Sequence, residues 1–219
     1  MIYTDKYNEL LTEVTGKASL VAVSKTKPKE DILELYTLGQ RDFAENYVQE
    51  LADKQELLPK DIRWHFIGHL QSNKVKFIAP FVSLIHSVDS LKLLKEIDKQ
   101  ATKNNRIIDC LLQVHIASEE TKFGLDETEL IKLLQSEELP LLRNITIRGL
   151  MGMATFTADQ NKIRNEFKFL KLFFDNCYRQ NNLNSFSILS MGMSADYRIA
   201  IEEGSNLVRI GSLLFGERS

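Results

Sequence analysis

The sequence predicts a single (β/α)8 barrel, the TIM-barrel class of α/β protein, over its 219 residues. Short apolar runs rich in β-branched residues alternate with amphipathic helical segments, a pattern that favours a parallel sheet. There are eight such runs, the number that closes a barrel of about 250 residues. No linker rich in Gly, Pro or Ser divides the chain, so residues 1–219 are predicted to form one domain. A doubly wound open sheet is the alternative, but "VSKTKP" lacks the usual Gly-rich first turn.

The predicted strands are the apolar runs, each bounded by polar residues. They cover residues 20–23, 41–46, 62–68, 82–88, 106–117, 144–155, 185–193 and 206–216. In a barrel the chemistry takes place at the C-terminal ends of the strands. The residues that follow each run are therefore the first candidates for a site.

Helix signals follow the strands. Ile32, Leu35 and Tyr36 share one helical face, with Pro28 suited to the first turn and Gly39 to the end of the helix. Further along the chain, Ser90 is a predicted N-cap for the helix over 91–103. Asp126 and Glu129 have the spacing of a capping box. The helix after the sixth run carries apolar residues at helical spacing: Ile163, Phe167, Leu170, Phe174 and Cys177.

Composition excludes several classes of partner. The 28 basic and 30 acidic residues give a net charge of −2, so no nucleic-acid partner is expected. No window reaches the roughly 18 apolar residues of a membrane span, and the first ten residues do not resemble a secretory signal. Cys110 and Cys177 lie far apart in unlike contexts and are predicted to be reduced thiols. We therefore expect a cytoplasmic protein.

Lys25 follows the first apolar run, at the predicted mouth of the barrel. A lysine there is partly desolvated, which lowers the pKa of its amine and makes it a nucleophile toward carbonyl groups. The alternative is a lysine whose stem is buried and whose ammonium reaches water. Lys27 and Lys122 are rim lysines that could compete for the same carbonyl.

The last two strands predict an anion site. Phosphate sites in these barrels often use the loops after strands 7 and 8, which here read "MGMSAD" and "RIGS". Gly192, Gly211 and the Ser194 hydroxyl would let backbone and side chain approach an anion closely. The alternative is that Ser194 is only an N-cap and Gly211 only a turn residue.

Two features near these strands admit two interpretations each. Arg209 lies in an otherwise apolar strand, where a charge is costly unless paired, so it either forms a structural ion pair or faces a ring nitrogen of a ligand. Met-Gly-Met occurs in both "GLMGMAT" and "LSMGMSA", as a shared packing solution or as soft apolar contacts for a flat ring.

An aldehyde-capturing lysine, an anion cradle and an intervening arginine together suggest pyridoxal 5′-phosphate as the ligand. The segments "AVSKTKP", "FAENYVQE", "WHFIGHLQSNK", "GLMGMAT", "LSMGMSADY" and "LVRIGSLLFGER" resemble the pyridoxal phosphate homeostasis protein family (YggS/PROSC-like). The resemblance extends from about residue 18 to 218. It implies a barrel of the alanine racemase N-terminal type, with an extra N-terminal helix.

The resemblance also implies the site residues. Lys25 would carry the cofactor as an internal aldimine, and Asn46 would line its ring. Ser194, Gly211 and Ser212 would hold the phosphate, and Arg209 would face the pyridine nitrogen. A permanently charged guanidinium there discourages protonation of the ring, which limits carbanion chemistry. No catalytic residue and no metal ligand are assigned.

One departure from the family pattern is His69 in "FIGHLQ", where many members have proline. His65 and His69 are four residues apart but lie on a strand-like segment, so a helical metal pair is not expected. His86 and His115 lie on predicted strands and are interpreted as core or rim residues.

Three functions are compared. The first is a protein of vitamin B6 homeostasis that stores, delivers or regulates pyridoxal phosphate, acts as a monomer, and passes cofactor to apoenzymes. The second is a weak amino-acid racemase of the fold-type III class, for which Tyr47 and Tyr197 near the rim are the candidate acids. A racemase would also need a β-domain that this chain is too short to contain. The third is a Schiff-base aldolase that uses Lys25 without cofactor.

Overall fold

The computed structural model describes residues 2–119, 123–181 and 185–216, and its strands close into a parallel barrel. The strands follow one another around the barrel in sequence order, and β8 pairs with β1 to complete the ring. They are β1 (Ser19–Val23), β2 (Asp42–Glu45), β3 (Arg63–Phe66), β4 (Leu84–Val88), β5 (Ile108–Val114), β6 (Ile145–Gly152), β7 (Ile188–Met193) and β8 (Leu207–Ile210). The predicted eight-stranded barrel is confirmed, and the open doubly wound sheet is wrong.

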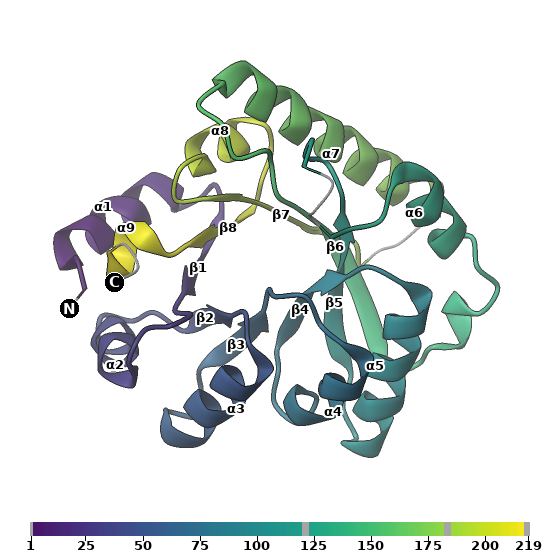
Figure 1. Cartoon of the computed structure of the whole chain (residues 1–219), viewed down its shortest axis with the longest axis horizontal. Coiled ribbons are helices and arrows are strands. Elements are labelled where there is room, and N and C mark those ends of the chain that lie inside the picture. Colours follow the sequence, from purple (N-terminus) through teal and green to yellow (C-terminus); the bar gives the residue numbers. More distant parts are fainter. Residues whose placement is uncertain (1, 120–122, 182–184, 217–219) are drawn as a thin grey trace.

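Helices surround the barrel on its outer face (Figure 1). They are α1 (Thr4–Val14), α2 (Lys29–Thr37), α3 (Val48–Leu57), α4 (Val75–Ile78), α5 (Leu91–Lys103), α6 (Glu127–Leu134), α7 (Gln160–Asn181), α8 (Tyr197–Glu202) and α9 (Ser212–Phe215), with 3-10 turns η1 (Ser72–Lys74) and η2 (Leu139–Leu141). The extra N-terminal helix is α1, which lies beside α9, and the Tyr3 amide donates to the Leu214 carbonyl.

The helix ends follow the predicted signals closely. The Ser90 hydroxyl accepts a hydrogen bond from the Leu93 amide, and both bonds of the Asp126–Glu129 capping box are present. Pro28 lies one position before the first helical residue of α2, and Gly39 follows this helix with a φ of +102°. Only glycine adopts that backbone geometry without strain, so it ends the helix where the sequence predicts.

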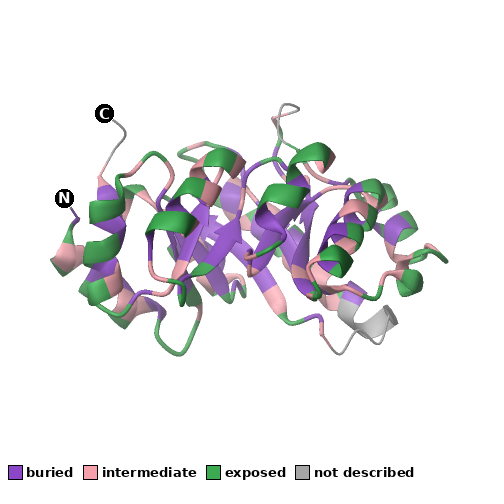
Figure 2. Ribbon diagram, turned by 90° about the horizontal axis from the view of Figure 1, so that it is seen from below, coloured by how far each residue is buried: buried purple, intermediate pink, exposed green. Residues whose placement is uncertain are grey.

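The strands form the buried centre of the molecule (Figure 2). Successive strand residues point to opposite faces, so alternate residues fill the barrel interior and the space under the helices. The inner cluster contains Val21, Val23, Ala44, Leu84, Leu111, Met151 and Leu207. The outer layer is much larger and includes Trp64, Phe66, Ile85 and Phe167. Because the interior is filled by side chains, a ligand can reach only its open ends.

The two Met-Gly-Met segments are not equivalent in the structure. Met151 belongs to the inner cluster, whereas Met191 packs in the outer layer beneath the helices. The β5–β6 and β7–β8 pairings each contain a register shift, which changes the face that a given position presents. The Met-Gly-Met triplet therefore occurs on two neighbouring strands, but its methionines do not form one shared contact surface.

Among the described residues, no helix has the length and apolar character needed to cross a membrane.

Candidate cofactor site at the barrel mouth

Lys25 lies two residues beyond the last residue of β1 and is half-buried. It keeps the alternation of Val21 and Val23, both of which belong to the inner cluster. The residue after it, Thr26, has a φ of +64°. A β-branched residue in the left-handed region is strained by roughly 1–3 kcal/mol, and such strain gathers at functional sites.

A charged cluster holds the backbone on both sides of Lys25. The Thr26 amide donates to Glu50 Oε1 at 2.6 Å, and Lys54 Nζ donates to the Ser24 carbonyl oxygen at 2.8 Å. Lys54 Nζ also binds Glu45 Oε1 at 2.8 Å and Glu50 Oε1 at 2.7 Å. The strained turn is therefore fixed by α3, which carries Glu50 and Lys54, and by β2, which carries Glu45.

Glu45 is the buried end of this cluster. Its side chain is fully buried, and burial raises the pKa of its carboxyl to about 7 despite the opposing effect of Lys54. Glu45 Oε1 accepts from the Ser24 hydroxyl at 2.7 Å, whereas Glu45 Oε2 has no hydrogen-bond partner among the described residues. A proton on the free oxygen removes the cost of an unpaired buried charge.

Asn46 presents an unpaired oxygen beside Lys25's strand. Its Oδ1 atom is buried and has no hydrogen-bond partner within the described ranges. Buried polar atoms are almost always paired, so an orphaned one is a candidate ligand contact. A Cβ atom at Gly68 would lie 2.0 Å from the Asn46 carbonyl oxygen, so the glycine of "FIGHLQ" lets this rim close tightly.

The predicted anion-binding residues come together between β7 and β8. The Gly211 amide donates to the Ser194 hydroxyl oxygen at 3.2 Å, which joins the two loops. A Cβ atom at Gly211 would lie 3.3 Å from the Val23 carbonyl oxygen, so this loop also lies against the end of β1. Ser212 is exposed, as an anion-binding hydroxyl must be. A hollow of about 250 Å³ opens beside Ser194, between α8 and the first residues of α7.

Ser194 is not the N-cap of α8. That position belongs to Asp196, whose Oδ1 accepts from the Met193 amide at 2.6 Å. The N-cap interpretation of Ser194 is therefore wrong, and its hydroxyl serves the β7–β8 junction.

Arg209 is a buried cation in β8, with its guanidinium bound to oxygens of the two preceding strands. Nη1 donates to the Ser190 hydroxyl at 2.6 Å and to the Ser190 carbonyl at 2.9 Å, and Nη2 donates to the Gly152 carbonyl at 3.0 Å. Burial lowers the pKa of Arg209 to about 10, so the guanidinium remains charged at neutral pH. Among the described residues it has no carboxylate within ion-pair distance, which disfavours the structural ion pair.

Other candidates lie away from this group or outside the described residues. Lys27 Nζ donates to the Phe215 carbonyl at 2.9 Å, and Lys122 is outside the described residues. Tyr47 is exposed, and the buried Tyr197 donates its hydroxyl proton to Glu13. Within the described ranges, no cluster of three or more His, Cys, Asp or Glu side chains could hold a metal ion.

Sequence reasoning missed the residues behind the mouth. Glu45 and Glu50 stood in the quoted segment "FAENYVQE", but neither they nor Lys54 were assigned a role. The sequence places His86 as a core or rim residue; it is fully buried, and its contacts with Ser190 and His65 are not among the predictions. A polar side chain within an apolar strand run was the available signal for His86 and Ser190.

Together these residues form a defined chemical arrangement. An amine lies at the end of β1, hydroxyl and glycine positions of the β7 and β8 loops lie against that strand end, and a fixed cation occupies β8. The orphaned Asn46 oxygen completes the rim. Such a site can take a planar, anionic carbonyl compound, with the amine as nucleophile and the cation facing a ring atom that carries a lone pair.

Comparison with known proteins identifies the class of this barrel. The family model "Alanine racemase, N-terminal domain" matches residues 4–219. The alanine racemase of Bartonella henselae superposes with a TM-score of 0.68 at 19% identity, covering 95% of this chain and 56% of that one, which shows the fold alone. The fold and the family model define a barrel of the alanine racemase N-terminal class.

More similar relatives carry a narrower name. A pyridoxal phosphate homeostasis protein from Aquifex aeolicus is 44% identical over 203 residues, covering 92% of this chain and 87% of the relative. The Homo sapiens protein of that name is 39% identical over 212 residues, covering 91% and 76%. The structure of PipY from Synechococcus elongatus with PLP bound has a TM-score of 0.87 at 35% identity, covering 97% and 99%. The chain belongs to the pyridoxal phosphate homeostasis protein family.

Proposed function

We propose that this chain binds pyridoxal 5′-phosphate at the barrel mouth and acts in its homeostasis, by storing, delivering or regulating the cofactor. The observation that carries the proposal is the joined pair of loops at Ser194 and Gly211, which lies against Val23 at the end of β1, the strand that Lys25 follows. The PLP-bound PipY structure and the names of the relatives support the choice of cofactor.

Each residue has a distinct role in this proposal. Lys25 is the covalent attachment point, as a Schiff base with the cofactor aldehyde. Ser194, Gly211 and Ser212 hold the phosphate through hydroxyl and amide donors, and Asn46 lines the ring. Arg209 faces the pyridine nitrogen, and its permanent charge disfavours a proton there. When bound, the cofactor supplies an electron sink, and the unprotonated ring keeps that sink weak.

The absence of robust catalysis is part of the same proposal. A racemase needs an acid or base on each face of the ring, and Tyr197 is a poor candidate because burial and Glu13 raise the pKa of its hydroxyl to about 12. Racemase activity remains the second candidate because the fold is shared. We further propose a cytoplasmic protein of one domain, residues 1–219, with PLP-dependent apoenzymes as recipients.

The absorption spectrum of the purified protein with added pyridoxal phosphate tests the attachment. We expect a visible band that borohydride abolishes, and a reduced label on Lys25 by peptide mass mapping. Lys25→Ala removes the band, whereas the control Lys27→Ala keeps it. A label on Lys27 or Lys122 would contradict the assignment of the lysine. A protein that takes up no cofactor would contradict the proposed function and make the aldolase alternative the next to test.

A further inference from the structure

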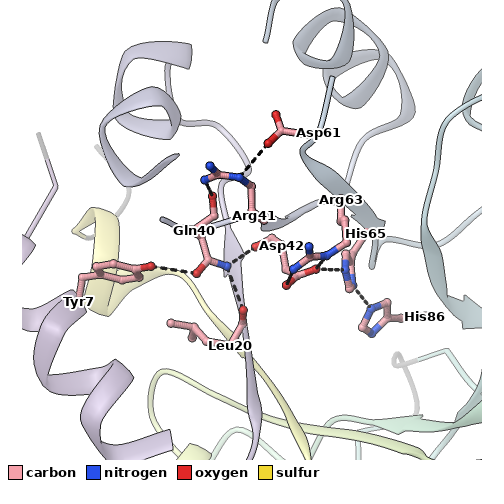
Figure 3. A network of polar contacts seen from close by, with 9 residues as sticks. All are labelled: Tyr7, Leu20, Gln40, Arg41, Asp42, Asp61, Arg63, His65 and His86. Atoms are coloured by element: carbon pink, nitrogen blue, oxygen red, sulfur yellow. Dashed lines mark hydrogen bonds and ion pairs between the residues drawn. The ribbon is translucent and has the colours of Figure 1, made fainter. Parts of the chain in front are cut away.

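The barrel interior contains a continuous chain of polar contacts behind the proposed cofactor site. Arg209 Nη1 lies 2.6 Å from Ser190 Oγ, which lies 3.0 Å from His86 Nδ1. His86 Nε2 lies 2.9 Å from His65 Nδ1, and His65 Nε2 lies 3.2 Å from Asp42 Oδ1. Figure 3 shows the part of the chain formed by Asp42, His65 and His86. Asp42 begins β2, so the chain starts at the end of the barrel opposite the mouth.

With both imidazoles neutral, the chemistry of the two end groups fixes every proton between them. A guanidinium can only donate and a carboxylate can only accept, while a neutral imidazole does one at each nitrogen. His65 must therefore donate from Nε2 to Asp42, which leaves its Nδ1 as an acceptor. His86 then donates from Nε2 to His65, and its Nδ1 accepts the Ser190 hydroxyl proton. Ser190 in turn accepts from Arg209.

The environment keeps His86 neutral and Asp42 charged. His86 is fully buried, and burial together with the neighbouring His65 and Arg209 lowers the pKa of its imidazole well below the usual value. Burial alone would raise the pKa of Asp42, but hydrogen bonds from His65 and Arg63 lower it to about 2. The two imidazoles thus lie between a carboxylate and a buried guanidinium. Aligned hydrogen bonds strengthen one another in such an interior.

We propose that Ser190, His86, His65 and Asp42 are positioning residues that hold the Arg209 guanidinium toward the barrel mouth through this polarised chain. The proposal rests on the proposed function, because it gives Arg209 its role beside the ring. It adds that the orientation of this cation is set from the far end of the barrel. Of the three oxygens that accept from Arg209 among the described residues, the Ser190 hydroxyl alone belongs to a side chain, so it is the contact through which the other members of the chain act on the guanidinium.

The chain of hydrogen bonds from Arg209 to Asp42 can be tested without cofactor, by recording the side-chain 15N resonances of labelled histidines in the cofactor-free protein. We expect His65 and His86 both to carry their proton on Nε2. Ser190→Ala should move the His86 Nδ1 resonance, whereas Ser205→Ala should not, because the buried Ser205 hydroxyl binds only backbone carbonyls. Protonation of His86 at Nδ1 in the wild type would overturn the proposal. This measurement uses the wild-type protein alone, so it does not depend on whether a variant folds.

Asp42, at the far end of the hydrogen-bond chain, can be tested with a variant and a matched control. Asp42→Asn should move the resonances of both His65 and His86, because the terminal charge polarises both rings. Asp61→Asn is the matched control, since Asp61 binds Tyr36 and Arg41 outside the chain. A response of His65 alone would show that the contacts do not act as a unit and would overturn the proposal.

The loaded protein tests the link to the cofactor. With a loosened Arg209, the ring nitrogen of bound pyridoxal phosphate should take up a proton more readily. In Ser190→Ala the visible band should therefore red-shift on acidification at a pH about half a unit above the wild type, a shift typical of one partly screened charge. A shift equal to that of Ser205→Ala would overturn the positioning role. If the wild type binds no cofactor, the proposed function fails while the histidine resonances still decide the chain.

Discussion

At the scale of the residue, individual polar groups determine what the mouth of the barrel can bind. The Ser194 hydroxyl oxygen accepts a hydrogen bond from the Gly211 amide, and the hydroxyl still has its own proton to donate. A bound phosphate would take that proton, so the same side chain would join two loops and hold the anion. Burial lowers the pKa of Arg209 to about 10, which still leaves its guanidinium charged at neutral pH.

Ser194→Ala should weaken the binding of pyridoxal phosphate by about 1–2 kcal/mol, the value of a hydrogen bond to a charged group, or roughly tenfold in Kd. Titration of the visible band with cofactor measures it. Ser187→Ala is a suitable control, because Ser187 is exposed at the start of the same loop-strand unit and bonds only the Ser185 carbonyl. Equal affinity for Ser194→Ala and the wild type would remove Ser194 from the phosphate contacts.

At the scale of the element, α3 and β2 act together on the turn that carries Lys25. The ends of Glu50 and Lys54 reach from α3 to the backbone at Ser24 and Thr26, and Glu45 reaches from β2 to the same ammonium. An unsupported turn would relax the positive φ of Thr26. Glu45 and Glu50 both bind the Lys54 ammonium. Two carboxyl groups therefore support the turn that carries Lys25, and each of them can bind a proton.

Glu45 makes the stability of the chain depend on pH. Its pKa in the fold is about 7, above its unfolded value, so the fold binds this proton more tightly. The contribution is complete below about pH 4.5 and is lost as the pH rises through 7, a change of roughly 3 kcal/mol. We therefore expect the urea midpoint of the wild type to fall between pH 5 and 8.

Glu45→Gln should remove most of this fall, because the amide does not titrate while its oxygen still accepts from Ser24 and Lys54. The exposed Glu56 on α3 is the control, and Glu56→Gln should keep the wild-type dependence. Urea unfolding of the three proteins at four pH values between 5 and 8 makes the comparison. A wild-type slope that persists in Glu45→Gln would place the titrating group elsewhere.

At the scale of the whole molecule, the sequence predicts what depends on local pattern. The barrel follows from strand and helix alternation, and Lys25, Ser194 and Gly211 follow from the rule that sites lie at strand ends. The histidine chain could not be predicted, because its contacts join β2, β3, β4, β7 and β8 across the interior. The opposite faces of Met151 and Met191 depend on register shifts that no local pattern encodes.

Closure of the barrel also bears on assembly. β8 pairs with β1, so the sheet has no free edge on which a second copy could add a strand. Large apolar side chains that are exposed belong to separate elements, such as Leu57 of α3, Leu141 of η2 and Leu172 of α7. Scattered apolar residues of this kind are normal on a monomer surface. The lysine, the anion loops and Arg209 all belong to one chain, so the proposed site needs no partner residue.

We therefore predict that the protein is a monomer with and without pyridoxal phosphate. Sedimentation equilibrium should give the mass of one chain, 25.2 kDa, across a hundredfold range of concentration. Phe156 lies in the loop between β6 and α7, and its side chain is 92% exposed. If the protein does associate, the variant Phe156→Ser tests whether this side chain forms the contact. A mass that rises toward twice the chain and returns to one chain in Phe156→Ser would contradict the prediction and locate the contact at the mouth. A mass of one chain in both proteins would confirm the prediction.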